Sequence, residues 1–177
     1  FEREFYMIPR DTYVSIKPVQ SATEVEFDRW RELGADALVI GSVENAGGRL
    51  RVQVRLLNVR SRVSVFGKEY EGSTNNPRLY AHTIADEIHQ SQHGVRGVAR
   101  TRLAFSSDRD GESIVGGIEE RNVKEIYISD YDGANEHRVT VHRSLNLFPM
   151  WSSDGRAISY TSYRHGYPDL TISFIYE

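Results

Sequence analysis

Two histidines four positions apart are the residues of this chain whose spacing comes closest to that of a metal site. His89 and His93 fall within a predicted helix, where this spacing places two imidazoles on one face and allows them to chelate zinc. The residues between them are Gln90-Ser91-Gln92, so the glutamate that serves as general base in the H-E-x-x-H motif of metalloproteases is absent. Polar residues surround the pair, which favours a solvated helix face.

The acidic segment 130–136 has oxygen-bearing side chains at alternate positions, a spacing that calcium-binding loops use. The calcium loop of helix-loop-helix proteins needs a glycine at its sixth position and a glutamate at its twelfth, and neither is in place here. Asp132-Gly133 after an apolar run is instead typical of a hairpin turn. We therefore predict no metal ion and no cofactor for this chain.

Several residues have the types that nucleophilic catalysis uses, namely Ser152, Ser153, Asp154, His142 and His165. Adjacent residues on one turn do not form a catalytic triad, because a triad is defined by its geometry. The chain has no G-x-S-x-G nucleophile elbow, and Gly116-Gly117 lacks the companion residues of a phosphate-binding loop. The chain is therefore predicted not to be an enzyme.

The 177-residue chain carries a net charge of −3 and no cysteine. This composition gives no electrostatic argument for a nucleic acid or an anionic membrane, and it excludes disulfides and thiolate zinc sites. No apolar run reaches the ~20 residues that span a bilayer, so no direct membrane insertion is predicted. The densest basic cluster is Arg49, Arg51 and Arg55, and Glu69 and Glu71 are expected to pair with it across a sheet.

The elements that must position these side chains change in type near residue 95. Residues 1–95 mix helix and strand signals, which predicts a small α/β layer of three or four strands with two helices on one face. The residue types of Thr23 and Asn76 favour helix starts, and Gly34 and Gly94 favour helix ends. The expected strands are 1–8, 36–44, 49–56 and 63–71, and the expected helices are 24–33 and 77–93.

Residues 49–56 alternate between polar and aliphatic side chains, which predicts a half-buried antiparallel strand with a basic solvent face. Leu57 breaks the alternation, so a β-bulge is expected there. The preceding segment 45–48, Asn-Ala-Gly-Gly, is expected to form the hairpin turn.

From residue 96 onward the helical signals disappear and short strands alternate with turns, which indicates an all-β fold. Part of this region occurs twice. Leu103 aligns with Ile158, 55 residues later, and residues 125–129 align with residues 169–173, 44 residues later. An insertion within residues 109–124 of the first copy explains the difference, and a period near 44 suits one four-stranded propeller blade.

The repeat includes a turn whose residues are Trp151, Asp154 and Gly155. Trp151 is expected to pack between neighbouring sheets, and Asp154-Gly155 to join two strands tightly. The predicted fold class is an α+β N-terminal domain (1–95), with a small mixed sheet and two helices, followed by an incomplete propeller segment of about one and a half blades (96–177). Because the chain opens on Phe1 and closes in a strand-like pattern, we expect it to be trimmed at both ends.

These segments resemble a known family. PMWSSDGRAISYTS (149–162) is similar to the WSPDG-type propeller repeat, with Ser153 in place of the usual proline, and KEIYISDYDGANEHRVT (124–140) strengthens the match. Four further segments complete the resemblance to the TolB family, whose members are periplasmic components of the Tol–Pal system of Gram-negative bacteria: RWRELGADALVIGSV (29–43), LRVQVRLLNV (50–59), LYAHTIADEIH (79–89) and GVRGVARTRLAFSSDR (94–109).

The resemblance implies a non-catalytic scaffold with an N-terminal α/β domain and a six-bladed propeller. It implies a periplasmic location and binding to two proteins that support outer-membrane integrity and cell division. These are the peptidoglycan-associated lipoprotein Pal, bound at the propeller mouth, and TolA, bound by an N-terminal segment that has no counterpart in this chain. The expected partner-binding segment here is the connection formed by Asn146, Leu147 and Phe148. Two alternatives stay open, the regulatory propeller of a prolyl-oligopeptidase-like serine hydrolase and a propeller adaptor with other partners.

Overall fold

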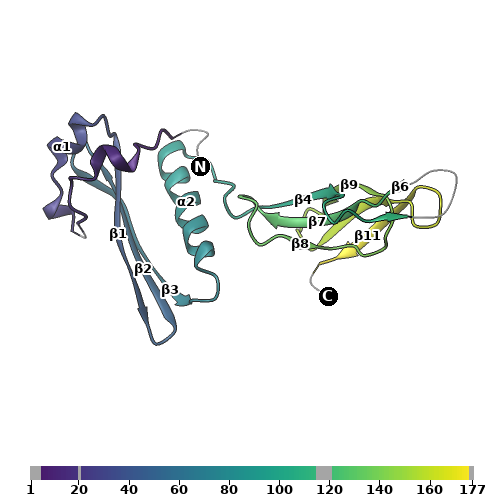
Figure 1. The fold of residues 1–177 in the computed structure, drawn as a ribbon. Coiled ribbons are helices and arrows are strands. Elements are labelled where there is room, and N and C mark those ends of the chain that lie inside the picture. The colour runs from purple at the N-terminus through teal and green to yellow at the C-terminus, as the bar shows by residue number, and fades with distance from the viewer. Residues whose placement is uncertain (1–4, 20, 115–120, 176–177) are drawn as a thin grey trace. The chain divides into compact units, whose positions relative to one another are not determined.

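The computed structural model describes residues 5–19, 21–114 and 121–175 (Figure 1). The chain divides into two compact units, Phe1–Arg100 and Thr101–Glu177. The first unit contains the 3-10 turns η1 (Arg10–Tyr13) and η2 (Ala22–Glu24), the helices α1 (Phe27–Glu32) and α2 (Pro77–His93), and the strands β1 (Ala37–Ala46), β2 (Arg49–Asn58) and β3 (Val63–Ser73).

The three strands of the first unit form an antiparallel sheet in the order β1-β2-β3. The sequence predicts a mixed sheet, but these three strands are antiparallel. The reason is that short turns join them in sequence, and such turns produce antiparallel neighbours. Gly47 and Gly48 make the first of these turns with φ values of +61° and +80°, which glycine adopts without a steric penalty. The expected hairpin turn is thus confirmed.

Strand β2 confirms the alternation read from its sequence. Its aliphatic residues are buried and its basic residues are exposed, and the pairing with β3 shifts between Leu56 and Leu57, where the bulge was expected. On the exposed face, Arg49 Nε lies 3.3 Å from Glu71 Oε1 and Arg51 Nε lies 3.2 Å from Glu69 Oε1. Arg49 and Arg51 of the basic cluster are therefore paired with glutamates within the sheet.

The two helices of the first unit lie on opposite faces of the sheet, and the prediction of one shared face is wrong (Figure 1). Helix α1 packs Trp30 on the face of Ile40 and Leu57, whereas Glu87 of α2 lies 2.9 Å from Lys68 Nζ on the other face. The physical reason is that both faces of β2 carry leucine at the bulge. Leu56 and Leu57 are both buried, so each face needs a cover.

The first residues of the chain also depart from prediction. Residues 1–4 lie outside the described residues, and Phe5–Ile8 do not form a strand, because no strand in the described part of the chain pairs with them. Helix α1 begins at Phe27 rather than at residue 24, and the Ser21 hydroxyl accepts a hydrogen bond from the Thr23 N–H in the preceding 3-10 turn.

Helix α2 has the predicted ends. The Asn76 side chain accepts a hydrogen bond from the Leu79 N–H (3.3 Å), Pro77 occupies the first turn, and Gly94 ends the helix with a φ of +72°. Asp86 on this helix is only 4% exposed. Its carboxylate accepts hydrogen bonds from the Ala99 N–H (2.7 Å) and from both the N–H (3.3 Å) and Nε (2.9 Å) of Arg100, and so fixes the last residues of the unit against the helix.

The second unit contains two three-stranded sheets and a small hairpin. The first sheet has the order β4-β7-β8, the second has the order β9-β10-β11, and β5 pairs with β6. The strands are β4 (Arg102–Ser107), β5 (Ser113–Ile114), β6 (Arg121–Asn122), β7 (Glu125–Asp130), β8 (His137–Arg138), β9 (Asn146–Trp151), β10 (Ala157–Ser162) and β11 (Asp169–Phe174).

Residues that are aligned between the two sequence repeats also occupy equivalent pairing positions in the two sheets. Leu103 pairs with Ser129 in the first sheet, and their aligned residues Ile158 and Ser173 pair in the second. The predicted insertion contains the β5–β6 hairpin, and its residues 115–120 lie outside the described residues. The facing sides of the sheets bury Ile126, Ile128, Ile158 and Tyr160 almost completely.

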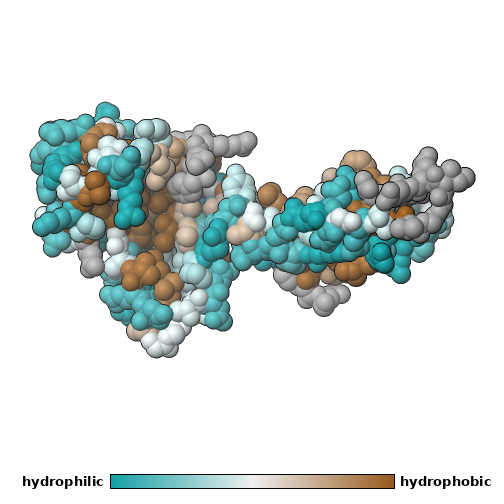
Figure 2. Space-filling model, viewed as in Figure 1, coloured by the Kyte–Doolittle hydropathy of each residue, from teal (hydrophilic) through white to brown (hydrophobic). Residues whose placement is uncertain are grey.

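Exposed hydrophobic side chains remain in both units. Figure 2 shows them over the strands of the first unit, where Val39 and Val43 of β1 are exposed. In the second unit, the side of the second sheet that points away from the shared core exposes Met150, Leu170, Ile172 and Phe174. We call these four residues the outer apolar face.

Candidate functional site

Phe148 in β9 has an unusual backbone conformation for a bulky residue. Leu147 pairs with Thr161 and Met150 pairs with Ser159, so Phe148 and Pro149 together oppose the single residue Tyr160. This two-against-one arrangement is a β-bulge, and bulges often redirect a side chain. Phe148 has a φ of +55°, a left-handed conformation that bulky residues rarely adopt, and its side chain is 78% exposed.

An exposed aromatic side chain held in strained backbone is a typical feature of a recognition site, because unusual backbone conformations gather at functional positions. Residues 146–148 were expected to form a connecting loop, but they are instead the first half of β9, because they run beside β10 and pair with it. We call the segment Leu147–Phe148–Pro149 the β9 bulge.

The three residues predicted to bind a partner have different environments. Phe148 is exposed and Leu147 is half-buried, but Asn146 is completely buried. Its Nδ2 donates hydrogen bonds to the Lys124 carbonyl (3.0 Å), to Glu125 Oε2 (3.0 Å) and to the Ser144 carbonyl (3.3 Å). Asn146 therefore fixes the start of β9 from inside the unit.

Glu125, at the start of β7, is the buried acceptor on which this arrangement is centred. Its side chain is only 2% exposed. Besides the bond from Asn146, its carboxylate accepts hydrogen bonds from Arg138 (3.0 Å), from the Arg143 N–H (2.6 Å) and from the Thr140 hydroxyl. A buried carboxylate is tolerated only when it is paired and hydrogen-bonded in this way.

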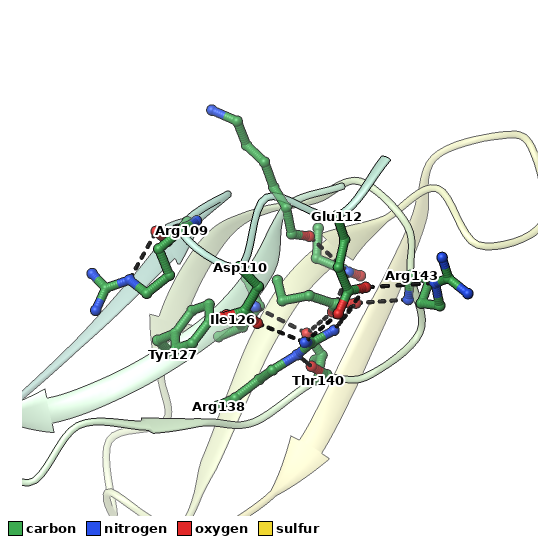
Figure 3. A network of polar contacts seen from close by, with 12 residues as sticks. Arg109, Asp110, Glu112, Ile126, Tyr127, Arg138, Thr140 and Arg143 are labelled. Carbon is green, nitrogen blue, oxygen red and sulfur yellow. Dashed lines mark hydrogen bonds and ion pairs between the residues drawn. The ribbon is translucent and has the colours of Figure 1, made fainter. Parts of the chain in front are cut away.

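Arg138 of β8 links Glu125 to the insertion. Figure 3 shows Arg138 with Asp110 and Glu112 of the insertion. The Arg138 guanidinium lies 2.6 Å from Asp110 Oδ2 and 2.8 Å from Glu112 Oε1. Hydrogen bonding to Glu112 and Glu125 raises the pKa of Arg138, and the hydrogen bond from Arg138 lowers the pKa of Glu112. Burial, together with its hydrogen bond to Asp110, raises the pKa of Tyr127 to about 12.

The lowered pKa of Glu112 makes the stability of the second unit dependent on pH. In the unfolded chain Glu112 binds its proton near pH 4.5, and in the folded chain it does so at lower pH, so the unfolded state binds more protons in this window. The stabilising contribution is complete above pH 4.5 and is lost as the pH falls through the folded-state pKa.

We therefore expect the melting temperature of the chain to fall on acidification from about pH 5 to about pH 3, and the Glu112→Gln variant to show a shallower fall. The measurement is thermal unfolding followed by circular dichroism across this range. Glu32→Gln, which alters an exposed glutamate of α1, is the control and should keep the wild-type slope. Equal slopes for Glu112→Gln and the wild type would contradict the assignment.

Trp151 is the last residue of β9, and Asp154 and Gly155 lie in the turn that connects it to β10. Gly155 has a φ of +69°, and Asp154 Oδ1 accepts hydrogen bonds from the Arg156 N–H (3.0 Å) and the Ser152 hydroxyl (2.5 Å). The bond from Ser152 lowers the pKa of Asp154. Trp151 packs against the core between the sheets. The serine and aspartate of this motif therefore stabilise a turn, and Ser153 beside them is exposed.

The remaining residues that the sequence analysis considered as metal ligands or catalytic groups contact neighbouring side chains and backbone. The rings of His89 and His93 lie 4.9 Å apart and Phe5 packs on them, with His89 Nδ1 3.1 Å from the Val95 carbonyl. In the segment 130–136, Asp132 accepts a hydrogen bond from the Ala134 N–H (3.1 Å) beside Gly133, whose φ is +82°. His165 Nδ1 lies 3.0 Å from Asp169 Oδ2 at an exposed turn.

None of the helices within residues 5–19, 21–114 and 121–175 is both long and apolar enough to cross a bilayer. The remaining indications come from similarity to known proteins. Residues 4–65 match the family described as the TolB amino-terminal domain.

Two relatives of the chain are proteins named Tol-Pal system protein TolB. The one from Desulfosudis oleivorans is 35% identical over 100% of this chain and 38% of its own length, and the one from Jannaschia is 35% identical over 95% of this chain and 36% of its own. The crystal structure of TolB from Acinetobacter baumannii matches 91% of this chain and 39% of that protein, with a TM-score of 0.77 and 19% identity.

The solved structure supports the fold, an N-terminal domain followed by part of a propeller. The predicted fold class is therefore confirmed, apart from the details of the sheet and helix positions given above. The chain spans less than two fifths of the length of these relatives. From the family match, the two relatives and the shared fold, we conclude that the chain belongs to the TolB family of Tol-Pal system proteins.

Proposed function

We propose that the chain is part of a non-catalytic periplasmic scaffold that binds Pal through the β9 bulge. The proposal rests on Phe148. Its side chain is 78% exposed, and it lies in the β9 bulge with a φ of +55°. An aromatic ring held rigidly at the surface offers a partner a large contact area at a low cost in conformational entropy. Family membership supplies the context, since the relatives are named for the Tol-Pal system.

In this proposal the second unit presents the recognition surface and the remaining blades of the longer protein complete it. Leu147 contributes its partly exposed side chain, and Asn146 contributes by fixing the strand from inside. TolA is the second partner, bound through a segment that precedes the residues of this chain. The two interactions together support outer-membrane integrity and cell division.

The test is a calorimetric titration of the full-length protein with purified Pal. Phe148→Ala is expected to weaken binding by about 2 kcal/mol, roughly 30-fold, because central aromatic residues dominate protein interfaces. Tyr6→Ala is the matched control, since Tyr6 is an equally exposed aromatic residue in the first unit, and it should leave the affinity unchanged. Wild-type affinity in Phe148→Ala would refute the proposed contact.

A further inference from the structure

Glu125 connects the interior of the second unit to the β9 bulge. It has four hydrogen-bond donors: Arg138 of β8, and then Thr140, Arg143 and Asn146. The last three belong to residues 139–146, which lead from β8 into the first residue of β9. We call residues 139–146 the sheet link. One buried carboxylate thus holds the beginning, middle and end of the sheet link.

Backbone hydrogen bonds join both ends of the sheet link to residues 124–126, and the Val139 N–H donates to the Ile126 carbonyl (2.8 Å). The Lys124 N–H donates to the Ser144 carbonyl (3.1 Å), and the Asn146 N–H donates to the Lys124 carbonyl (2.9 Å). Arg143 has a φ of +52°, an uncommon conformation for this residue. Its N–H reaches Glu125 Oε1 at 2.6 Å in that conformation. The Glu125 carboxylate therefore stabilises a backbone conformation that the sequence of the sheet link does not itself favour.

Phe148 follows the end of the sheet link by two residues. The direction in which β9 begins is set by Asn146, because its side chain is bound to Glu125 and its carbonyl accepts a hydrogen bond from the Ser106 hydroxyl (2.5 Å). Asn146 pairs with Ser162 at the start of β9, two residues before the point where Phe148 and Pro149 oppose Tyr160. The contacts of Glu125 therefore hold the end of the strand from which the Phe148 ring projects.

We infer that Glu125 is a positioning residue for partner recognition, which acts through the sheet link on the presentation of Phe148. This inference rests on the proposed function, because it assigns Glu125 to the same binding surface. All four partners are donors, so the role needs a side chain that offers two acceptor oxygens. A glutamine has nearly the same shape but presents an NH2 group to donors.

The decisive variant is Glu125→Gln in the full-length protein, with Asp110→Asn as the matched control. Asp110 accepts from the same Arg138 and from the Tyr127 hydroxyl, and both of these donors lie outside the sheet link. At a temperature where both variants are folded, Glu125→Gln is expected to weaken Pal binding by about tenfold, and Asp110→Asn by less than about twofold. Amide hydrogen exchange should accelerate at residues 143–148 in Glu125→Gln alone.

A double-mutant cycle separates positioning from a general loss of structure. If Glu125 acts through Phe148, the variant Glu125→Gln with Phe148→Ala will bind Pal no more weakly than Phe148→Ala does. If Glu125→Gln fails to fold, Glu125→Asp keeps the charge and shortens the side chain, and it should show intermediate exchange at residues 143–148.

The outcomes distinguish the two proposals. Full affinity in a folded Glu125→Gln variant, or additive effects in the cycle, would overturn the role of Glu125 while the Phe148 contact stands. Full affinity in Phe148→Ala would overturn the contact itself. The amide exchange rates at residues 143–148 would then test the structural part of the inference, namely that Glu125 holds the sheet link in place. Rates in Glu125→Gln equal to those of the wild type would overturn that part too.

Discussion

Asp86→Ala is expected to lower the free energy of unfolding of the first unit by about 3 kcal/mol. The Asp86 carboxylate is 4% exposed, and it accepts from two backbone N–H groups and from the Arg100 guanidinium. Removing one partner of a buried ionic contact leaves the other groups without compensation, which costs more than the contact itself contributes. Residues 97–100 also pack closely against α2 here, because a Cβ on Gly97 would lie 2.4 Å from Asp86 Oδ1.

Urea denaturation of the 177-residue chain, followed by far-ultraviolet circular dichroism, measures this loss. Asp28→Ala is the control, because Asp28 pairs with Arg31 and Arg62 at the surface and such exposed pairs contribute less than about 1 kcal/mol. Asp86→Asn keeps one acceptor oxygen and should fall between the wild type and Asp86→Ala. A loss in Asp86→Ala no larger than in Asp28→Ala would show that the carboxylate does not hold residues 97–100 in place.

The second large effect concerns association of the isolated chain. The outer apolar face exposes Leu170 (79%), Phe174 (62%), Ile172 (57%) and Met150 (69%) on one side of a sheet. Contiguous apolar surface of this kind is rare on monomers and drives association. We therefore expect the 177-residue chain by itself to form oligomers or aggregates.

Sedimentation velocity over a range of concentrations tests this expectation. The variant with Leu170→Thr and Ile172→Thr should shift the chain towards monomer, because threonine keeps the strand propensity and removes apolar area. Val141→Thr, at an exposed position outside the strands, is the control and should associate as the wild type does. A monodisperse wild-type monomer at all concentrations would contradict the role of the outer apolar face.

Local sequence patterns predicted the elements whose signals are contained within a few residues. The alternation in β2, the bulge at Leu57 and the two ends of α2 depend on neighbours in the chain, and each is confirmed. The positions of the two helices were not predictable in the same way. Their apolar residues show that each helix is covered on one side, but the choice of sheet face depends on the bulge and on the connections.

The residues of the candidate site were harder to find. Phe148 was included in the predicted partner-binding segment, but nothing in its residue type signals a positive φ, which is usual for glycine or asparagine. Glu125 was missed because its donors follow it by 13 to 21 positions and meet only in the folded sheet link. One signal in the sequence pointed to Glu125: it is a charged residue directly before the apolar run Ile126-Tyr127-Ile128. A position at the start of such a run is usually buried, and a buried charge needs partners.

Site-specific photo-crosslinking at position 148 of the full-length protein tests most directly whether Phe148 contacts Pal. A benzoylphenylalanine placed there keeps the aromatic ring and reacts only with groups in contact with it. We predict a crosslink to Pal from position 148 and none from the exposed control position Tyr6. Formation of the complex without any crosslink from position 148 would contradict the claim that Phe148 of β9 contacts the partner.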